Sequence, residues 1–130
     1  MIPMFIYGTL KRGHSRAHVL ADQTFVRTAR TVAAYRLYDC RHFPALVEDR
    51  EYGIGVEGEL WQINPALLPT LDKIEAVDEG LYVRGSVQLE GVPARAAAYL
   101  YNRSVAGLAC CGSRWSVRGE RSDDDEKGEF

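Results

Sequence analysis

The strongest constraint on the fold is a succession of short segments with strand character, accompanied by only one convincing helix. These segments are rich in β-branched and aromatic residues, and turn-forming glycines and prolines separate them. Many short strands with one main helix favour an α+β fold, in which a small curved or barrel-like sheet carries the helix at its rim. The expected strands lie within residues 4–7, 24–37, 45–47, 53–63, 81–89 and 94–101.

Two parts of this pattern are more specific. Residues 81–89 and 94–101 flank a turn that contains glycine and proline, and they are predicted to form a hairpin. Residues 53–63 alternate in polarity, and their glycines indicate a bulge or a close approach of another backbone segment. Glu57 and Glu59 share one face of this strand, where acidic residues are expected to face solvent.

The main helix is predicted between residues 64 and 77. Asn64 is a suitable N-cap, Pro65 suits the first helical position, and Gly80 lies just beyond the expected end. Residues 14–21 are predicted to form a second, shorter helix. The apolar residues that follow helical spacing in the main helix are Leu67, Leu68, Leu71, Ile74 and Ala76.

Composition excludes several classes of function. The chain has 130 residues, enough for one domain with a real core, and its net charge of −2 offers no attraction for nucleic acid. No apolar stretch approaches the ~20 residues that span a membrane, and the apolar start is expected to be a first strand, not a signal peptide. Three cysteines without CxxC spacing favour free thiols in a reducing, cytoplasmic setting over a disulfide framework or a zinc site.

The C-terminal segment differs from the rest in composition. Residues 120–129 hold six acidic residues against two basic ones, which is typical of a solvated, disordered segment. The sequence therefore predicts one globular domain over residues 1–118 and an acidic tail over residues 119–130.

A loop near the N-terminus is the first candidate for a functional site. In residues 4–13, MFIYGTLKRG, an apolar strand runs into Tyr7, Gly8, Thr9 and Leu10. A strand that turns sharply at a glycine exposes backbone N–H groups, which can hold a carboxylate or a developing oxyanion. The basic pair at positions 11 and 12 is expected to make the rim positive. The alternative is a hairpin turn with a basic edge.

Glu75 is the second candidate. It follows Ile74 directly and lies four residues after Leu71, at the edge of the apolar stripe of the main helix. An acid in that position either belongs to a solvated helix face or turns into a pocket. Partial burial in a pocket would raise its pKa and suit it to proton transfer.

Several motifs together resemble a known family. They cover most of residues 3–118, and their ordered combination is more specific than any one of them. The chain is similar to the gamma-glutamylcyclotransferase-like family, which includes the gamma-glutamylamine cyclotransferases and the plant avirulence-induced-gene proteins. The motifs are YGTLKRG near the N-terminus, FPALVED at 43–49, GVEGELWQI at 55–63, LDKIEAVDEGLYVR at 71–84 and AYLYN at 98–102.

The resemblance implies a role for particular residues. Glu75 matches the catalytic acid/base of the family, and Tyr82 and Tyr99 match tyrosines that line the pocket in some members. Ala76 departs from the glycine that often follows the catalytic glutamate, so the substrate could differ. The fold implied is a small mixed, mostly antiparallel β-barrel with one main helix and short helices at its rim. The residues that match the substrate-binding loop are Tyr7, Gly8, Thr9 and Leu10.

The implied reaction cyclises a gamma-glutamyl group to 5-oxoproline and releases an amine, amino acid or peptide. It requires no cofactor and no metal, because the attacking amine belongs to the substrate itself. The expected partner is a small gamma-glutamyl substrate, with no nucleic acid and no membrane, and the protein is expected to be a monomer or weak homodimer. The alternative is a non-catalytic member of the same fold that binds a small ligand or a protein.

Overall fold

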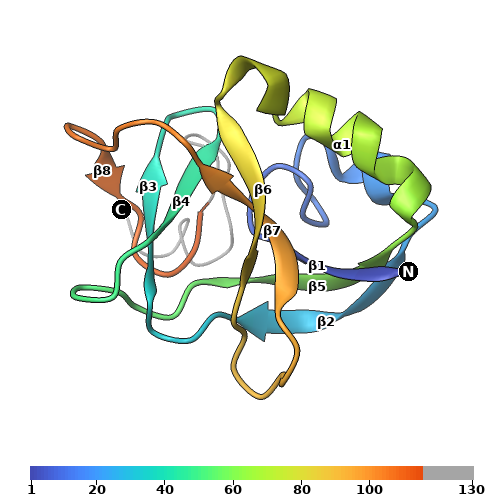
Figure 1. The fold of residues 1–130 in the computed structure, drawn as a ribbon, viewed down its shortest axis with the longest axis horizontal. Coiled ribbons are helices and arrows are strands. Elements are labelled where there is room, and N and C mark those ends of the chain that lie inside the picture. Colours follow the sequence, from blue (N-terminus) through green and yellow to red (C-terminus); the bar gives the residue numbers. More distant parts are fainter. Residues whose placement is uncertain (116–130) are drawn as a thin grey trace, which may run out of the picture.

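The computed structural model describes residues 1–115, which form eight strands and one α-helix. A five-stranded sheet has the order β2-β5-β1-β7-β6, and a three-stranded sheet has the order β4-β3-β8 (Figure 1). The strands are β1 (Ile2–Ile6), β2 (Thr24–Arg30), β3 (Tyr35–Asp39), β4 (Pro44–Glu48), β5 (Glu57–Ile63), β6 (Tyr82–Val87), β7 (Ala96–Tyr101) and β8 (Ala109–Cys110).

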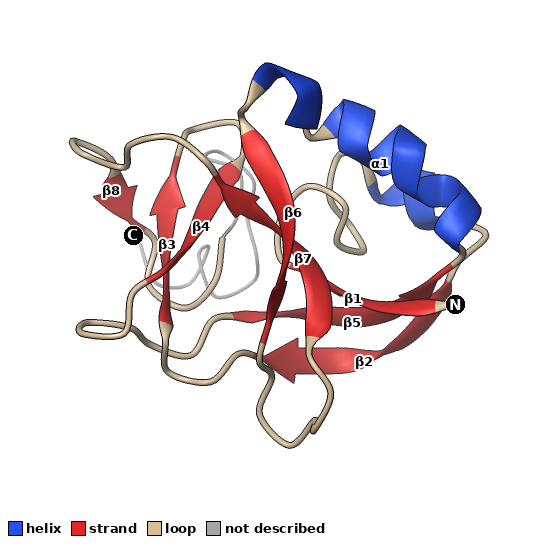
Figure 2. Ribbon diagram, viewed as in Figure 1, coloured by secondary structure: helices blue, strands red, loops and turns tan. Residues whose placement is uncertain are grey.

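The predicted fold class is confirmed, with one difference in the sheet. All strand pairs are antiparallel except β1 with β7, so the fold is α+β with mostly antiparallel strands and one main helix. The strands of residues 1–115 form two sheets that pack on one another through a shared core, not one closed barrel (Figure 2). Among these residues, no helix has the length and apolar character needed to cross a membrane.

The hairpin and the other predicted strands are present. The hairpin is formed by β6 and β7, which pair in register from Tyr82 opposite Tyr101 to Val87 opposite Ala96. The segment 24–37 divides into β2 and the start of β3. Strand β8 was not predicted, because two residues carry no periodic signal. The predicted tail lies outside the described residues, so the division of the chain at residue 118 stays a prediction.

The main helix begins as predicted and ends earlier. The Asn64 side chain accepts a hydrogen bond from the backbone N–H of Ala66 (2.9 Å), which caps a 3₁₀ turn over Pro65–Leu67 that leads into α1 (Leu68–Ile74). Ala76 then adopts a left-handed conformation (φ 53°), which breaks the helix before a 3₁₀ turn over Val77–Glu79. The second predicted helix is a 3₁₀ turn over Ala17–Leu20.

Strand β1 is buried on both faces. Met4 and Ile6 point into a cluster beneath α1, whereas Phe5 belongs to the cluster between the two sheets, because alternate strand residues face opposite ways. Neighbouring strands cover its two edges, β5 on one side and β7 on the other. The residues that follow β1 are buried as well, among them Tyr7, Thr9 and Leu10, so the chain continues within the interior of the domain.

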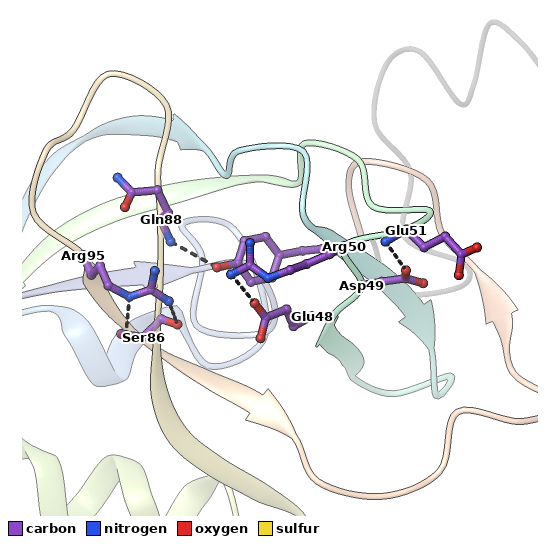
Figure 3. A network of polar contacts seen from close by, with 8 residues as sticks. Glu48, Asp49, Arg50, Glu51, Ser86, Gln88 and Arg95 are labelled. Carbon is purple, nitrogen blue, oxygen red and sulfur yellow. Dashed lines mark hydrogen bonds and ion pairs between the residues drawn. The ribbon is translucent and has the colours of Figure 1, made fainter.

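Figure 3 shows polar contacts at the edge of the two sheets, one of which joins the sheets to each other. The backbone N–H of Gln88, just after β6, donates to the hydroxyl of Tyr35 in β3 (3.2 Å). Nearby, Arg95 binds the Ser86 hydroxyl across the hairpin (2.8 Å). Exposed ion pairs such as Arg50 with Glu48, also drawn there, contribute little to stability.

The predicted close approach of backbone at the glycines of residues 53–63 is confirmed. A Cβ on Gly58 would meet the carbonyl oxygen of Ile6 and lie 2.7 Å from the ring of Phe5. The irregularity in register lies in the partner strand, between Phe25 and Arg27 of β2. Gly58 thus lets β5 approach the end of β1, directly before the candidate loop.

We predict that Gly58→Ala lowers the free energy of unfolding by about 2–3 kcal/mol, because the backbone of Ile6 cannot move away from the new methyl group. The matched control is Gly85→Ala in β6, whose Cβ would meet only the side chain of Leu100 at 3.0 Å. That side chain can turn, so the control should lose less than about 1 kcal/mol. Urea unfolding measures both, and equal losses would show that the approach at Gly58 is not tight.

Candidate active site

A cavity of about 120 Å³ lies between the end of β1 and the end of α1. In Figure 1 the blue segment after β1 runs beneath the helix. This cavity brings together every residue that the sequence analysis proposed for a site. Those residues are Tyr7, Gly8, Thr9, Leu10, Glu75, Tyr82 and Tyr99.

Residues 7–10 form one wall of the cavity, and we call them the 7–10 loop. The carbonyl of Gly8 accepts from the N–H of Lys11 (3.0 Å), and the carbonyl of Thr9 accepts from the N–H of Arg16 (2.8 Å). Within residues 1–115, the N–H groups of Gly8, Thr9 and Leu10 have no acceptor. Unpaired donors on a cavity wall can bind a carboxylate or an oxyanion.

The glycine of this loop is required by packing. A Cβ on Gly8 would lie 2.8 Å from Cγ of Pro44, the first residue of β4. The φ angle of Gly8 is not among the positive values, so a side chain there would clash without straining the turn. Gly8 therefore allows the loop to pass directly over β4.

Three tyrosines line the cavity, and each hydroxyl is anchored. Tyr7 donates to the carbonyl of Tyr99, and Tyr82 donates to the carbonyl of Pro44. The Tyr99 hydroxyl donates to Oδ1 of Asp72 (2.6 Å). Burial is the main cause that raises the pKa of all three phenols above the ordinary value. They therefore remain neutral and cannot serve as bases at physiological pH.

Glu75 caps the C-terminal end of α1. Its backbone N–H donates to the carbonyl of Leu71 (2.9 Å), and the left-handed residue Ala76 follows it. Burial raises the pKa of Glu75 to about 7, against a smaller opposing effect from Arg16. Glu75 can therefore exchange a proton near neutral pH, which the three tyrosines cannot do.

The neighbouring acid on the same helix behaves differently. Asp72 lies in an ion pair with Arg84 (3.0 Å) and accepts the hydroxyl of Tyr99. Although its burial acts to raise the pKa, the hydrogen bonds from Arg84 and Tyr99 lower the pKa of Asp72 overall. Asp72 is therefore a fixed anion that holds Tyr99, and Arg84 has a structural place, away from the cavity lining.

The expectation of a positive rim from residues 11 and 12 is wrong. Lys11 is buried and its Nζ donates to the carbonyl of Trp115 (2.9 Å). The guanidinium of Arg12 lies over the ring of Phe25 and forms an ion pair with Glu59 (3.0 Å). Both cations turn away from the cavity because the core and an acid on β5 hold them.

The expectation that Glu57 and Glu59 face solvent is correct only for the first. Glu57 forms an exposed ion pair with Arg30 (2.8 Å). Glu59 is buried, and it accepts from Nε1 of Trp61 (3.0 Å) and from Arg12. Pairing with these donors compensates for its burial.

The sequence analysis missed one charged residue of the cavity, Arg16. It lies at the start of the 3₁₀ turn after the loop, and it is the residue whose positive charge acts on Glu75. A single arginine in a polar turn gives no signal of its own. Other lining residues that it missed are the apolar Phe5, Ile6, Phe43, Pro44, Ile74 and Leu81.

Comparisons with known proteins identify the family and the fold of this chain. Residues 4–117 match the family described as gamma-glutamyl cyclotransferase, AIG2-like. The chain is 35% identical over 96 residues to gamma-glutamylaminecyclotransferase A of Danio rerio, covering 68% of this chain and 59% of that protein. It is 36% identical over 95 residues to a putative gamma-glutamylcyclotransferase of Arabidopsis thaliana, covering 66% of this chain and 50% of that protein.

A solved structure is similar in fold. The AIG2-like protein of Mus musculus superimposes with a TM-score of 0.75 at 24% identity, covering 93% of this chain and 99% of that one. At this identity the likeness concerns the fold alone. The chain thus spans between one half and three fifths of the length of the two curated relatives above.

The burial of Glu75 leads to a prediction about stability that is independent of any reaction. Its pKa of about 7 exceeds the ordinary value of 4.5, so the folded state holds this proton more tightly than the unfolded state. The stabilising contribution is therefore complete below about pH 4.5 and is lost as pH rises through 7. Relative to wild type, Glu75→Gln should gain about 1–3 kcal/mol in free energy of unfolding between pH 5 and pH 9.

Urea unfolding of both proteins at several pH values measures this gain, and groups that titrate in both proteins cancel in the difference. Glu79→Gln, at an exposed position four residues further on, is the control and should give a difference that does not change with pH. A constant offset for Glu75→Gln as well would contradict the burial of this carboxyl group.

Proposed function

The chain belongs to the gamma-glutamyl cyclotransferase, AIG2-like family, and on this premise we propose that it is a cofactor-independent gamma-glutamyl cyclotransferase. The observation that carries the proposal is one cavity that holds both a carboxyl group with a pKa of about 7 and a loop whose backbone N–H groups have no partner within residues 1–115. The substrate is a small molecule with a gamma-glutamyl group, as the names of the relatives indicate for those proteins.

The 7–10 loop would bind the gamma-glutamyl group and hold it folded. Its N–H groups are donors for the carbonyl oxygen that becomes negative when the substrate's own α-amine attacks. Because the nucleophile and the carbonyl belong to one molecule, positioning can supply ~7–11 kcal/mol of the barrier. The anchored hydroxyls of Tyr7, Tyr82 and Tyr99 would keep the walls of the cavity in place.

Glu75 would act as both base and acid. As a carboxylate, it takes a proton from the substrate ammonium, and the freed amine forms a C–N bond to the gamma-carbonyl carbon. As a carboxylic acid, it gives that proton to the departing nitrogen while the original amide C–N bond breaks, and it then accepts the second proton that the ring nitrogen must lose. This second proton passes to the released amine, so the products are 5-oxoproline and an ammonium group, and the carboxylate is restored. A cytoplasmic location and a monomer or weak homodimer are part of the same proposal.

The general test is incubation with a panel of gamma-glutamyl compounds, with 5-oxoproline as the measured product. The panel includes glutathione, gamma-glutamyl dipeptides and gamma-glutamyl-lysine. Formation of 5-oxoproline with release of the amine is the expected result. Binding of these compounds without turnover would instead favour a non-catalytic member of the fold.

We predict that Glu75→Gln lowers turnover at least ~100-fold, because glutamine keeps the size of the side chain and cannot take a proton. Folding and substrate affinity should be retained, so the loss appears in kcat more than in KM. Steady-state kinetics on a confirmed substrate measure the change. The exposed Glu79→Gln is the matched control, and near-wild-type turnover in Glu75→Gln would refute the mechanism.

Activity should depend on the protonation of Glu75. Because burial raises its pKa to about 7, kcat/KM should fall below that pH, approaching tenfold for each pH unit under about 6. The charged or titratable groups that act on it are Arg16, Tyr7, Tyr82 and Tyr99, and the three phenols stay neutral in this range. A bound ammonium lowers the pKa of a carboxyl group, so the fall of kcat on the acid side should lie at lower pH than the fall of kcat/KM.

A pH series between 5 and 8.5 with a buffer of constant ionic strength measures how kcat and kcat/KM each fall on the acid side. A kcat/KM that stays constant over this range would show that a group other than Glu75 moves the proton.

A further inference from the structure

Arg16 places a positive charge on the cavity, and the proposed reaction does not use it. Its backbone N–H donates to the carbonyl of Thr9 (2.8 Å), so its position is tied to the 7–10 loop. Arg16 lines the same cavity as Glu75 and Tyr82. The charge acts on both of these residues, since it lowers the pKa of each against the larger effect of burial.

Arg16 differs from other arginines of the chain that form ion pairs with acidic side chains. Arg12 pairs with Glu59, and Arg84 pairs with Asp72. Within residues 1–115, the guanidinium of Arg16 has no hydrogen bond and lies in no ion pair. A guanidinium presents a fork of N–H donors that fits a carboxylate, so this group is suited to bind one.

The depth of the cavity indicates which part of a substrate would meet this group. The 7–10 loop lies in the interior, with Tyr7, Thr9 and Leu10 each less than 9% exposed, whereas Arg16 is exposed. A cavity of about 120 Å³ is small beside the ~300–1,000 Å³ of sites for larger ligands. If the gamma-glutamyl group occupies the interior, the departing group must emerge past Arg16.

We propose that Arg16 determines specificity by binding a carboxylate on the departing group. This inference rests on the proposed function and adds a substrate class to it. The preferred substrates are gamma-glutamyl amino acids or peptides, whose departing nitrogen lies next to a carbon that bears a carboxylate. Gamma-glutamyl amines without a carboxylate are poorer substrates, and those with a cationic departing group are disfavoured by the charge of Arg16.

The test compares gamma-glutamyl-glycine with gamma-glutamyl-glycinamide, which differ only in the charge of the departing group. Both carry the same α-amine and α-carboxylate on the glutamyl part, so these divide out of the ratio of kcat/KM. Wild type should prefer the acid by roughly 10- to 100-fold, the effect of a hydrogen bond to a charged group. In Arg16→Gln the ratio should fall to about threefold or less.

Two further variants make the comparison specific. Arg16→Lys keeps the charge and loses the fork, so it should retain part of the preference. Arg27→Gln removes the same charge from an exposed position on β2 that does not line the cavity, and its ratio should match wild type. Any effect of Arg16 on the pKa of Glu75 applies to both substrates and leaves the ratio unchanged.

The outcomes separate this inference from the proposed function. If both compounds are cyclised and Arg16→Gln keeps the wild-type ratio, the inference is overturned and the function stands. An equal loss of kcat/KM on both compounds in Arg16→Gln would indicate that Arg16 contacts the glutamyl part of the substrate. That result would also overturn the inference. If neither these two compounds nor any compound of the panel yields 5-oxoproline, the proposed function fails. Calorimetric affinities of gamma-glutamyl-glycine and gamma-glutamyl-glycinamide for wild type and Arg16→Gln then decide the carboxylate preference without turnover, and equal affinities would overturn the inference.

Discussion

The burial of β1 on both faces is the constraint on which the rest of this structure depends. β5 and β7 cover its edges, and two separate hydrophobic clusters cover its faces. The chain that follows this strand also lies in the interior, because Tyr7, Thr9 and Leu10 are all buried. Gly58 and Gly8 make this possible, because each lets a neighbouring segment pass where a Cβ would collide.

The environment around α1 shifts the pKa values of two acids in opposite directions, although they are only three residues apart. Asp72 is held by Arg84 and Tyr99, and it remains an anion. Glu75 is the residue directly after the helix, at its C-cap, where burial favours the neutral acid. The break at Ala76 is what ends the helix at this point and places Glu75 beside the cavity. The same short segment thus supplies one structural acid and one acid suited to proton transfer.

The cavity holds few charges, and their arrangement gives the site its chemical character. Its phenols are neutral and anchored, so among residues 1–115 Glu75 and Arg16 are the lining groups whose charges a substrate would meet. A carboxyl group that gains and loses a proton near pH 7 suits the transfer from one nitrogen of a substrate to another. A guanidinium at the more exposed end can select the departing part by its charge. Proton transfer by Glu75 and recognition of the departing group by Arg16 would then take place at different depths of the same cavity.

The sequence by itself determined the local elements. The Asn64 cap and the β6–β7 hairpin each depend on residues that are close in the chain. The glycine at position 58 indicated a close approach, although its partners, Ile6 and Phe5, are remote in the sequence. The sequence also predicted that the 7–10 loop and Glu75 belong to one site, through its resemblance to a family.

Only the tertiary structure decided where the charged side chains lie and which groups surround them. Lys11 turned inward to the carbonyl of Trp115, Glu59 was buried beside Trp61, and Arg16 came to line the same cavity as Glu75. The physical reason is distance along the chain. Propensity and periodicity describe neighbouring residues, whereas the pKa or partner of a charged side chain is set by groups that folding brings from remote segments.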